Sequence, residues 1–203
     1  MKKRLVILFC FMIPLFCSSQ NLKDEYNNCA VERFEQQDYV GAIEYFTRVI
    51  ELFPNDSLAY FDRAMVKDVI QDYKGAIEDY TKQIAIDHES IDSYFLRGMA
   101  KHQLKDNDGA IADYTKALEL EPTNSDAYYW RSISKTEQEN FKGALEDCNK
   151  AIERNGNNFK CYLQRGKLNQ SLKQNESACK DFTRFVQLGG EQTLVPIKLP
   201  CDK

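Results

Sequence analysis

Histidine, cysteine and clustered carboxylates are the side chains of this 203-residue sequence that could support catalysis or metal binding. The two histidines, His88 and His102, lie at no metal-ligand spacing and at no motif distance from a cysteine. The run Asp106 to Gly109 offers oxygen ligands like those of a calcium loop, but the remaining ligands are missing. Other acidic pairs lie on polar helix faces, where solvated charge is expected. We therefore predict no catalytic residues, no metal, no cofactor and no small-molecule substrate.

Five of the seven cysteines lie beyond residue 19, and five thiols cannot all pair within one chain. Cys29, Cys148 and Cys179 fall at apolar positions of helical patterns, where a free cysteine behaves as a small hydrophobe. We predict that these three pack in the core. Cys161 and Cys201 have no such pattern, and Cys201 is a candidate disulfide partner for Cys161 or Cys179.

Arginine and aspartate recur in pairs that could form ion pairs. Each of four arginines is followed sixteen residues later by an aspartate, the pairs being Arg63 and Asp79, Arg97 and Asp113, Arg131 and Asp147, and Arg165 and Asp181. Because a guanidinium binds a carboxylate with two parallel hydrogen bonds, we predict a half-buried bidentate pair in each case. Each pair would tie together two neighbouring helices.

A 34-residue step runs through the whole chain and explains this spacing. Gly41-Ala42-Ile43 recurs at residues 75–77, 109–111 and, with small changes, at 143–145 and 177–179. The same step gives a tyrosine column, a small-residue column and a mostly aromatic column. These columns are Tyr26, Tyr60, Tyr94, Tyr128 and Tyr162; Ala30, Ala64, Gly98, Ser132 and Gly166; and Phe46, Tyr80, Tyr114, Cys148 and Phe182. Such regular alternation of large and small residues predicts five repeats with closely approaching helices.

Each repeat contains two helical patterns separated by a polar residue. Apolar residues recur at intervals of three and four, as in amphipathic helices. The polar residues in the middle are Asp38, Asp72, Asp106, Asn140 and Gln174, of which the first four are good N-caps for a second helix. Pro54 and Pro122 close their repeats. Each repeat is therefore predicted to be a helix-turn-helix unit.

From Leu22 to Gly190 the pattern resembles the tetratricopeptide repeat in its period, its small, aromatic and alanine columns and its closing proline. Departures are Cys148 in the aromatic column, His88, Gly156 and Gly190 in place of proline, and repeats that do not begin with tryptophan. The resemblance implies an all-α, right-handed α-solenoid of five 34-residue helix-turn-helix repeats. It also implies that the first helices line a concave surface that binds other proteins.

The columns of the first helices indicate what such a surface would bind. The lysine and asparagine set that holds a terminal carboxylate in well-known family members is absent at the matching columns, where Asn27, Val31, Asp62, Asp92 and Leu96 stand. Aromatic and methionine side chains suit an adaptable apolar contact surface. We predict protein-binding residues at Phe61, Met65, Phe95, Leu96, Met99, Tyr129, Trp130 and Ile133. Packing between adjacent first helices is the alternative role, chiefly for Phe61, Phe95 and Tyr129.

The N-terminal residues 1–19 have the organisation of a secretory signal, with Lys2 to Arg4 before a short apolar run. Lipidation at Cys17 is a less favoured alternative, because Phe16 stands where a lipoprotein signal has a small residue. We therefore expect an exported protein, periplasmic or secreted, without membrane anchoring. With 27 Lys and Arg against 31 Asp and Glu, the chain lacks the basic excess of nucleic-acid binders, and no nucleic-acid partner is expected.

The chain is thus divided into a signal peptide at 1–19, a five-repeat solenoid at 20–190 and a tail at 191–203. Gly189, Gly190, Pro196 and Pro200 predict that the tail is extended, and its apolar residues suggest docking over the last repeat or in a groove. The leading functional hypothesis is an adaptor or scaffold that binds an apolar segment of a partner protein. The alternatives are self-assembly into a homo-oligomer through the solenoid ends or the tail, and an enzyme, which bound metal or cofactor would reveal.

Overall fold

The computed structural model describes residues 19–195, which form ten α-helices and one short 3₁₀ turn and contain no strand. The predicted signal segment, apart from Ser19, lies outside the described residues, as do residues 196–203 of the predicted tail. The chain divides into two compact units, residues 1–93 and 94–203. None of the helices between residues 19 and 195 is long and apolar enough to span a bilayer.

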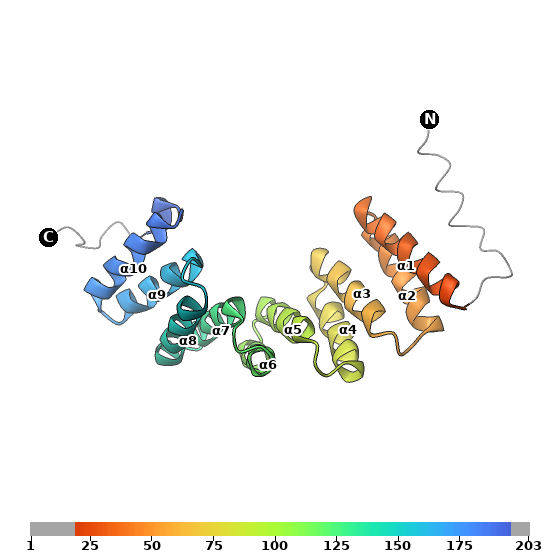
Figure 1. The fold of residues 1–203 in the computed structure, drawn as a ribbon, viewed down its shortest axis with the longest axis horizontal. Helices are drawn as coiled ribbons and strands as arrows, with labels where there is room; N and C mark the ends of the chain where they lie inside the picture. The colour runs from red at the N-terminus through yellow and green to blue at the C-terminus, as the bar shows by residue number, and fades with distance from the viewer. Residues whose placement is uncertain (1–18, 196–203) are drawn as a thin grey trace, which may run out of the picture. The chain divides into compact units, whose positions relative to one another are not determined.

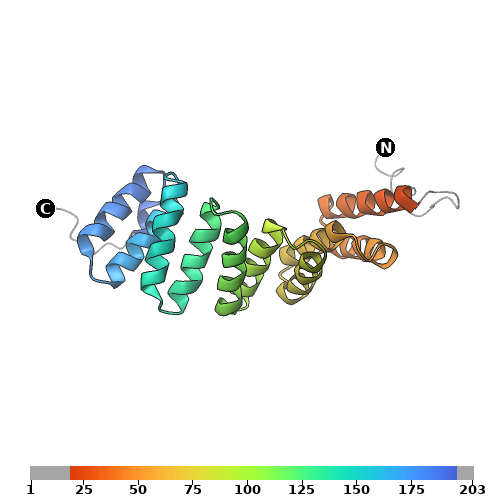
Figure 2. The same ribbon diagram turned by 60° about the horizontal axis from the view of Figure 1, so that its bottom comes forward.

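Both units are built from helix pairs whose two members run side by side and are joined by a short turn (Figure 1). The first unit contains α1 (Ser19–Glu35), α2 (Tyr39–Leu52), α3 (Ser57–Val69) and α4 (Tyr73–Ile86). The second contains most of α5 (Ile91–Gln103), then α6 (Asn107–Leu120), α7 (Ser125–Glu137), α8 (Phe141–Arg154), α9 (Phe159–Ser171), α10 (Asn175–Gln187) and η2 (Gln192–Leu194). Figure 2 shows α6 to α10 stacked side by side, from green to blue. The five helix-turn-helix units predicted from the 34-residue step are present in the described residues.

The turn inside each pair ends one helix and caps the next with consecutive residues. In the second pair, Gln71 adopts a φ of 63° and donates its N–H to the Asp68 carbonyl, while the Asp72 N–H reaches the Lys67 carbonyl. This is the Schellman arrangement that closes many helices. The Asp72 side chain then accepts from the Gly75 N–H and caps α4. The same side-chain cap is made by Asp38, Asp106 and Asn140, as predicted, whereas Gln174 makes none.

The small-residue column allows the paired helices to approach closely. A Cβ atom added at Gly98 would lie 2.8 Å from the Tyr114 ring, and one added at Gly166 would lie 2.7 Å from the Phe182 ring. Distances below about 3 Å between such atoms are not tolerated without movement, so the aromatic column needs the small column opposite it. In the fourth pair the roles are adjusted together, because Cys148 replaces the ring and lies 3.4 Å from Ser132 Oγ.

Three cysteines differ from the sequence-based expectation. Cys161, for which no packing role was predicted, is a free thiol with 0% exposure in a cluster that includes Tyr128 and Leu118. It occupies a second small column, Ala59, Ser93, Ala127 and Cys161, whose side chains are all buried. Cys148 and Cys29 are buried as predicted. Cys179 is half-buried and, like Cys29, takes part in a disulfide. A disulfide at Cys179 was one of the two alternatives suggested from the sequence, whereas none was expected at Cys29.

The free state of Cys161 argues against the suggested pairing with Cys201, which itself lies outside the described residues. The first part of the tail is also less extended than predicted. Gln192–Leu194 form a single 3₁₀ turn, closed by hydrogen bonds from Leu194 to Glu191 and from Val195 to Gln192. Leu194 is exposed.

Candidate protein-interaction surface

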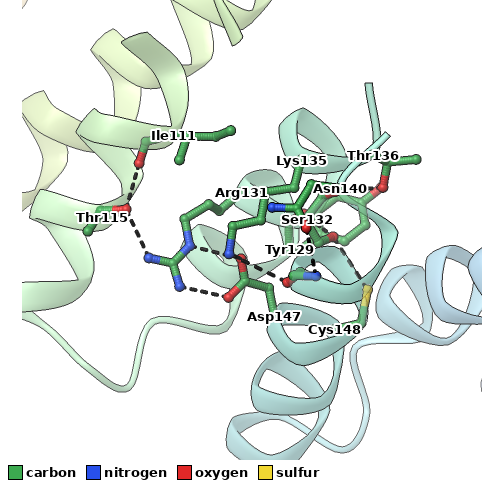
Figure 3. Close-up of polar contacts among 11 residues, drawn as sticks. Ile111, Thr115, Tyr129, Arg131, Ser132, Lys135, Thr136, Asn140, Asp147 and Cys148 are labelled. Carbon is green, nitrogen blue, oxygen red and sulfur yellow. Dashed lines mark hydrogen bonds and ion pairs between the residues drawn. The ribbon is translucent and has the colours of Figure 1, made fainter. Parts of the chain in front are cut away.

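The first helix of each of the last four pairs is held in place by a predicted arginine and aspartate pair. The first pair has Cys29 and Tyr45 at these positions. Arg131 on α7 donates from Nε to Asp147 Oδ2 at 2.9 Å and from Nη2 to Asp147 Oδ1 at 2.7 Å. Its third nitrogen, Nη1, donates to Thr115 Oγ1 on α6 at 3.0 Å. Figure 3 shows Arg131 between these two partners, so that one side chain ties α7 to the helices before and after it. The other bidentate pairs are Arg63 with Asp79, Arg97 with Asp113 and Arg165 with Asp181.

Two further contacts in this network were not predicted. Lys135 reaches Asp147 Oδ2 at 2.7 Å, so the carboxylate faces two cations while its side chain is only 2% exposed. Lys67 and Lys101 do the same in their repeats, and in the last repeat Asn169 donates to Asp181 instead. The guanidinium of Arg131 also lies over the Tyr128 ring, 5.5 Å from its centroid. The signal was available, because these lysines stand four residues after the arginines in the 34-residue register.

In the second unit, the predicted surface residues lie on α5 and α7 and are all half-buried. Phe95 and Tyr129 pack against the core cluster that contains Tyr128 and Leu118, which gives both a packing role. Trp130 makes edge contacts with the rings of Tyr129 and His102, with centroids 5.6 and 5.8 Å apart. The other three predicted residues of this unit are Leu96, Met99 and Ile133.

In the first unit, Met65 on α3 is 44% exposed, more than any other predicted surface residue. Phe61, one turn earlier, is half-buried and packs its edge against the Tyr80 ring, 5.9 Å between centroids. Beside Met65 the exposed side chains of Val31 and Phe34 come from α1. Val31 stands 34 residues before Met65 and so occupies the same column of the repeat. Phe34, which was not predicted, stands three residues after Val31 on the same helix face.

A small apolar hollow lies between α1 and α3, beside Met65. Its volume is about 150 Å³ and its walls are Val31, Phe34, Phe46, Asp62, Met65 and Val66. An apolar cavity of roughly this size can hold a group as large as benzene. The hollow therefore accepts one large apolar side chain.

His102 on α5 and Ser134 on α7 are neighbours, as a catalytic base and nucleophile would be. His102 Nδ1 lies 3.2 Å from Ser134 Oγ, and His102 Nε2 lies 3.8 Å from Glu137. A serine nucleophile must reach a substrate, but Ser134 has 0% exposure and His102 has 8%. The cluster joins α5, α6 and α7, since His102 Nδ1 also lies 3.2 Å from Asn107 Oδ1. Its contacts are those of a structural polar cluster.

The free thiols also lack the features of reactive cysteines. Burial raises the pKa of the Cys148 thiol to about 11 and that of Cys161 to about 12, so both are protonated at neutral pH. A reactive cysteine instead has a lowered pKa and access to solvent. In residues 19–195, no group of three or more His, Cys, Asp or Glu side chains is arranged to hold a metal ion.

Comparison with known proteins gives a consistent result. Family models of the tetratricopeptide repeat match residues 91–124 and residues 33–56. A search of curated protein sequences gave no match. Among solved structures, the MamA protein is similar with a TM-score of 0.79 at 21% identity, over 83% of this chain and 92% of MamA.

Two further structures show the same likeness. YrrB, described as a TPR protein with an unusual peptide-binding site, has a TM-score of 0.73 at 18% identity, over 84% of this chain and 88% of its own. A tetratricopeptide repeat protein from Parabacteroides merdae ATCC 43184 has a TM-score of 0.76 at 17% identity, over 82% of this chain and 66% of its own. At these identities the similarity establishes a shared fold and nothing finer.

Proposed function

This chain is a tetratricopeptide repeat protein, and from that premise we propose that it binds an apolar segment of a partner protein on the surface of its first helices. The observation that carries the proposal is the exposed apolar surface around the hollow between α1 and α3. Soluble proteins place large apolar side chains together on the surface mainly where another molecule covers them. The peptide-binding site named for YrrB supports a role in protein recognition for this fold.

In the second unit, the proposal assigns Leu96, Met99, Trp130 and Ile133 to contact with the partner. Tryptophan buries a large area on binding, and methionine adapts its shape to varied partners. Both properties suit a recognition surface. The ion pairs that hold α7 between α6 and α8 would keep Trp130 in place before binding. Preorganisation of this kind reduces the entropy lost on association.

The test is affinity capture with the mature chain and two matched variants. The first variant replaces Met65, Met99 and Trp130 with alanine. The control replaces the exposed second-helix residues Val40, Leu52 and Ile86 with alanine, removing a similar amount of apolar surface. Both variants must retain the helix content of the wild type. We expect specific proteins to bind the wild type and the control and to be lost from the first variant; equal capture by all three contradicts the proposal.

Export to the periplasm or the medium is part of the same proposal and rests on residues 1–19 of the sequence. Amino-terminal sequencing of the protein recovered from expressing cells tests it. A mature chain beginning near residue 20 is expected, and an intact Met1 in the cytoplasm would contradict export. Self-assembly is the competing function, and a molecular mass that rises with protein concentration, with no partner captured, would favour it.

A further inference from the structure

The apolar surface of the first unit contains one unpaired carboxylate. On α3, Leu58, Asp62, Met65 and Val69 stand at intervals of four, three and four residues, so they share one helix face. Leu58, Met65 and Val69 are exposed apolar side chains, and Asp62 lies among them, half-buried in the wall of the hollow. Nothing in an apolar contact surface requires an aspartate at its centre.

Asp62 has no hydrogen bond or ion pair with any other residue that the structure describes. Burial, and then the nearby negative charge of Asp56, raise the pKa of its carboxyl above the ordinary value. Both effects mean that the charged form of Asp62 is disfavoured where it stands. A cation placed beside it would favour the charged form and so offset both effects.

No cation of the chain on these two helices is available for that role. α1 carries Lys23 and Arg33, which pair with Asp56 and Asp38 respectively. α3 carries Arg63 and Lys67, and both bind Asp79, at 2.6 and 2.8 Å.

One polar atom of α1 in this region is also an acceptor without a partner. Asn27 Oδ1, one turn before Val31, is buried and makes no hydrogen bond. A buried acceptor left unpaired is costly, so a ligand that brings donors to this surface gains more than one that brings only apolar area.

We propose that the groove between α1 and α3 selects a partner segment that places a large apolar side chain in the hollow and an adjacent lysine or arginine against Asp62. This inference rests on the proposed function and specifies the chemistry of its partner. The apolar side chain contacts Val31, Phe34 and Met65, and the cation forms a charge-assisted hydrogen bond with a carboxylate that the fold leaves free. The match is one of charge as well as shape, which gives specificity that an apolar hollow alone lacks.

The test is selection of a random peptide library displayed on phage against the immobilised full chain. The wild type is expected to enrich peptides in which a large apolar residue stands close to Lys or Arg. Binding of one enriched peptide is then measured by fluorescence anisotropy for the wild type, for Asp62→Asn and for the control Glu78→Gln, which removes an exposed carboxylate from α4. Asp62→Asn should weaken binding about tenfold, as expected for loss of one charge-assisted hydrogen bond, and should abolish most of its salt dependence. Glu78→Gln should change neither.

The possible failures are distinguishable. Enrichment of apolar peptides without cations, bound equally well by Asp62→Asn, overturns the cation inference and leaves the proposed function intact. If the same peptides are enriched when Val31 and Met65 are both replaced by alanine, the groove is not the binding site. That result contradicts the proposed function of this surface as well. Binding of a synthetic peptide of residues 191–203 with the same dependence on Asp62, together with concentration-dependent mass, would identify a second copy as the occupant and overturn the partner inference.

Discussion

Replacement of Asp147 by asparagine tests whether the ion-pair network holds the repeats together. The change keeps the shape of the side chain but removes the charge that faces Arg131 at 2.7 Å and Lys135 at 2.7 Å. The two cations that remain are largely buried, since the side chains of Arg131 and Lys135 are only 12% and 18% exposed. Breaking a buried pair by removing one partner costs about 3–5 kcal/mol, because the remaining charge is uncompensated. Since Arg131 retains Thr115 and some access to water, we expect the lower end, about 3 kcal/mol.

The assay is thermal unfolding followed by circular dichroism, at low and high salt. For a chain of this size a loss of about 3 kcal/mol lowers the Tm by roughly 6–12 °C. The control is Glu119→Gln, which breaks the pair with Lys116 at a site where both side chains are about half exposed. Such surface pairs contribute less than about 1 kcal/mol. The reasoning is refuted if Asp147→Asn unfolds within 2 °C of the control.

Three other substitutions test separate parts of the account. Gly98→Ala should lower the free energy of unfolding by about 1–2 kcal/mol, because the added Cβ would lie 2.8 Å from the Tyr114 ring. The control Gly156→Ala, whose nearest contact would be 3.7 Å, should be neutral. Equal urea midpoints for the two variants would contradict the close packing of the columns. Gln174→Asp should stabilise by about 1 kcal/mol by supplying the missing cap of α10, and no gain in the same assay would argue against the capping explanation. Asp62→Asn should stabilise the chain at neutral pH, because the raised pKa shows that the folded state disfavours the charged carboxylate. That gain should shrink as pH falls through the raised pKa of Asp62 toward its ordinary value, since the wild-type carboxyl is then protonated as well; a gain independent of pH would contradict the burial argument.

Much of the fold could be predicted because each feature repeats. The 34-residue step gave four or five instances of each column. The caps at Asp38, Asp72, Asp106 and Asn140 and the pairing of each arginine with its own aspartate therefore followed from spacing and were confirmed. The packing of Cys161 was not predicted, because it is recognisable only from the column to which Cys161 belongs. Cys161 looked unexplained alone, yet with Ala59 and Ala127 it forms a buried small column.

The candidate site was less predictable, because exposure depends on tertiary packing. A helical pattern places Phe61, Phe95 and Met65 on the same face of their helices. It does not reveal that Phe61 packs against Tyr80 and Phe95 against the core, while Met65 remains exposed. That the cations on α1 and α3 are all bound to other carboxylates and not to Asp62 also required coordinates. The sequence does not determine which carboxylates the four cations on α1 and α3 bind, and the structure shows these pairs.

The central claim, that the first helices carry the protein-binding surface, is tested most directly by site-specific photocrosslinking. A benzophenone amino acid is placed at Met65 or Trp130 on first helices, and at Val40 or Leu52 on α2, in the full chain expressed in its own cells. The account predicts a discrete higher-mass adduct with another protein from positions 65 and 130 and none from positions 40 and 52. Adducts formed only from α2 would contradict the account, as would positions 65 and 130 yielding none.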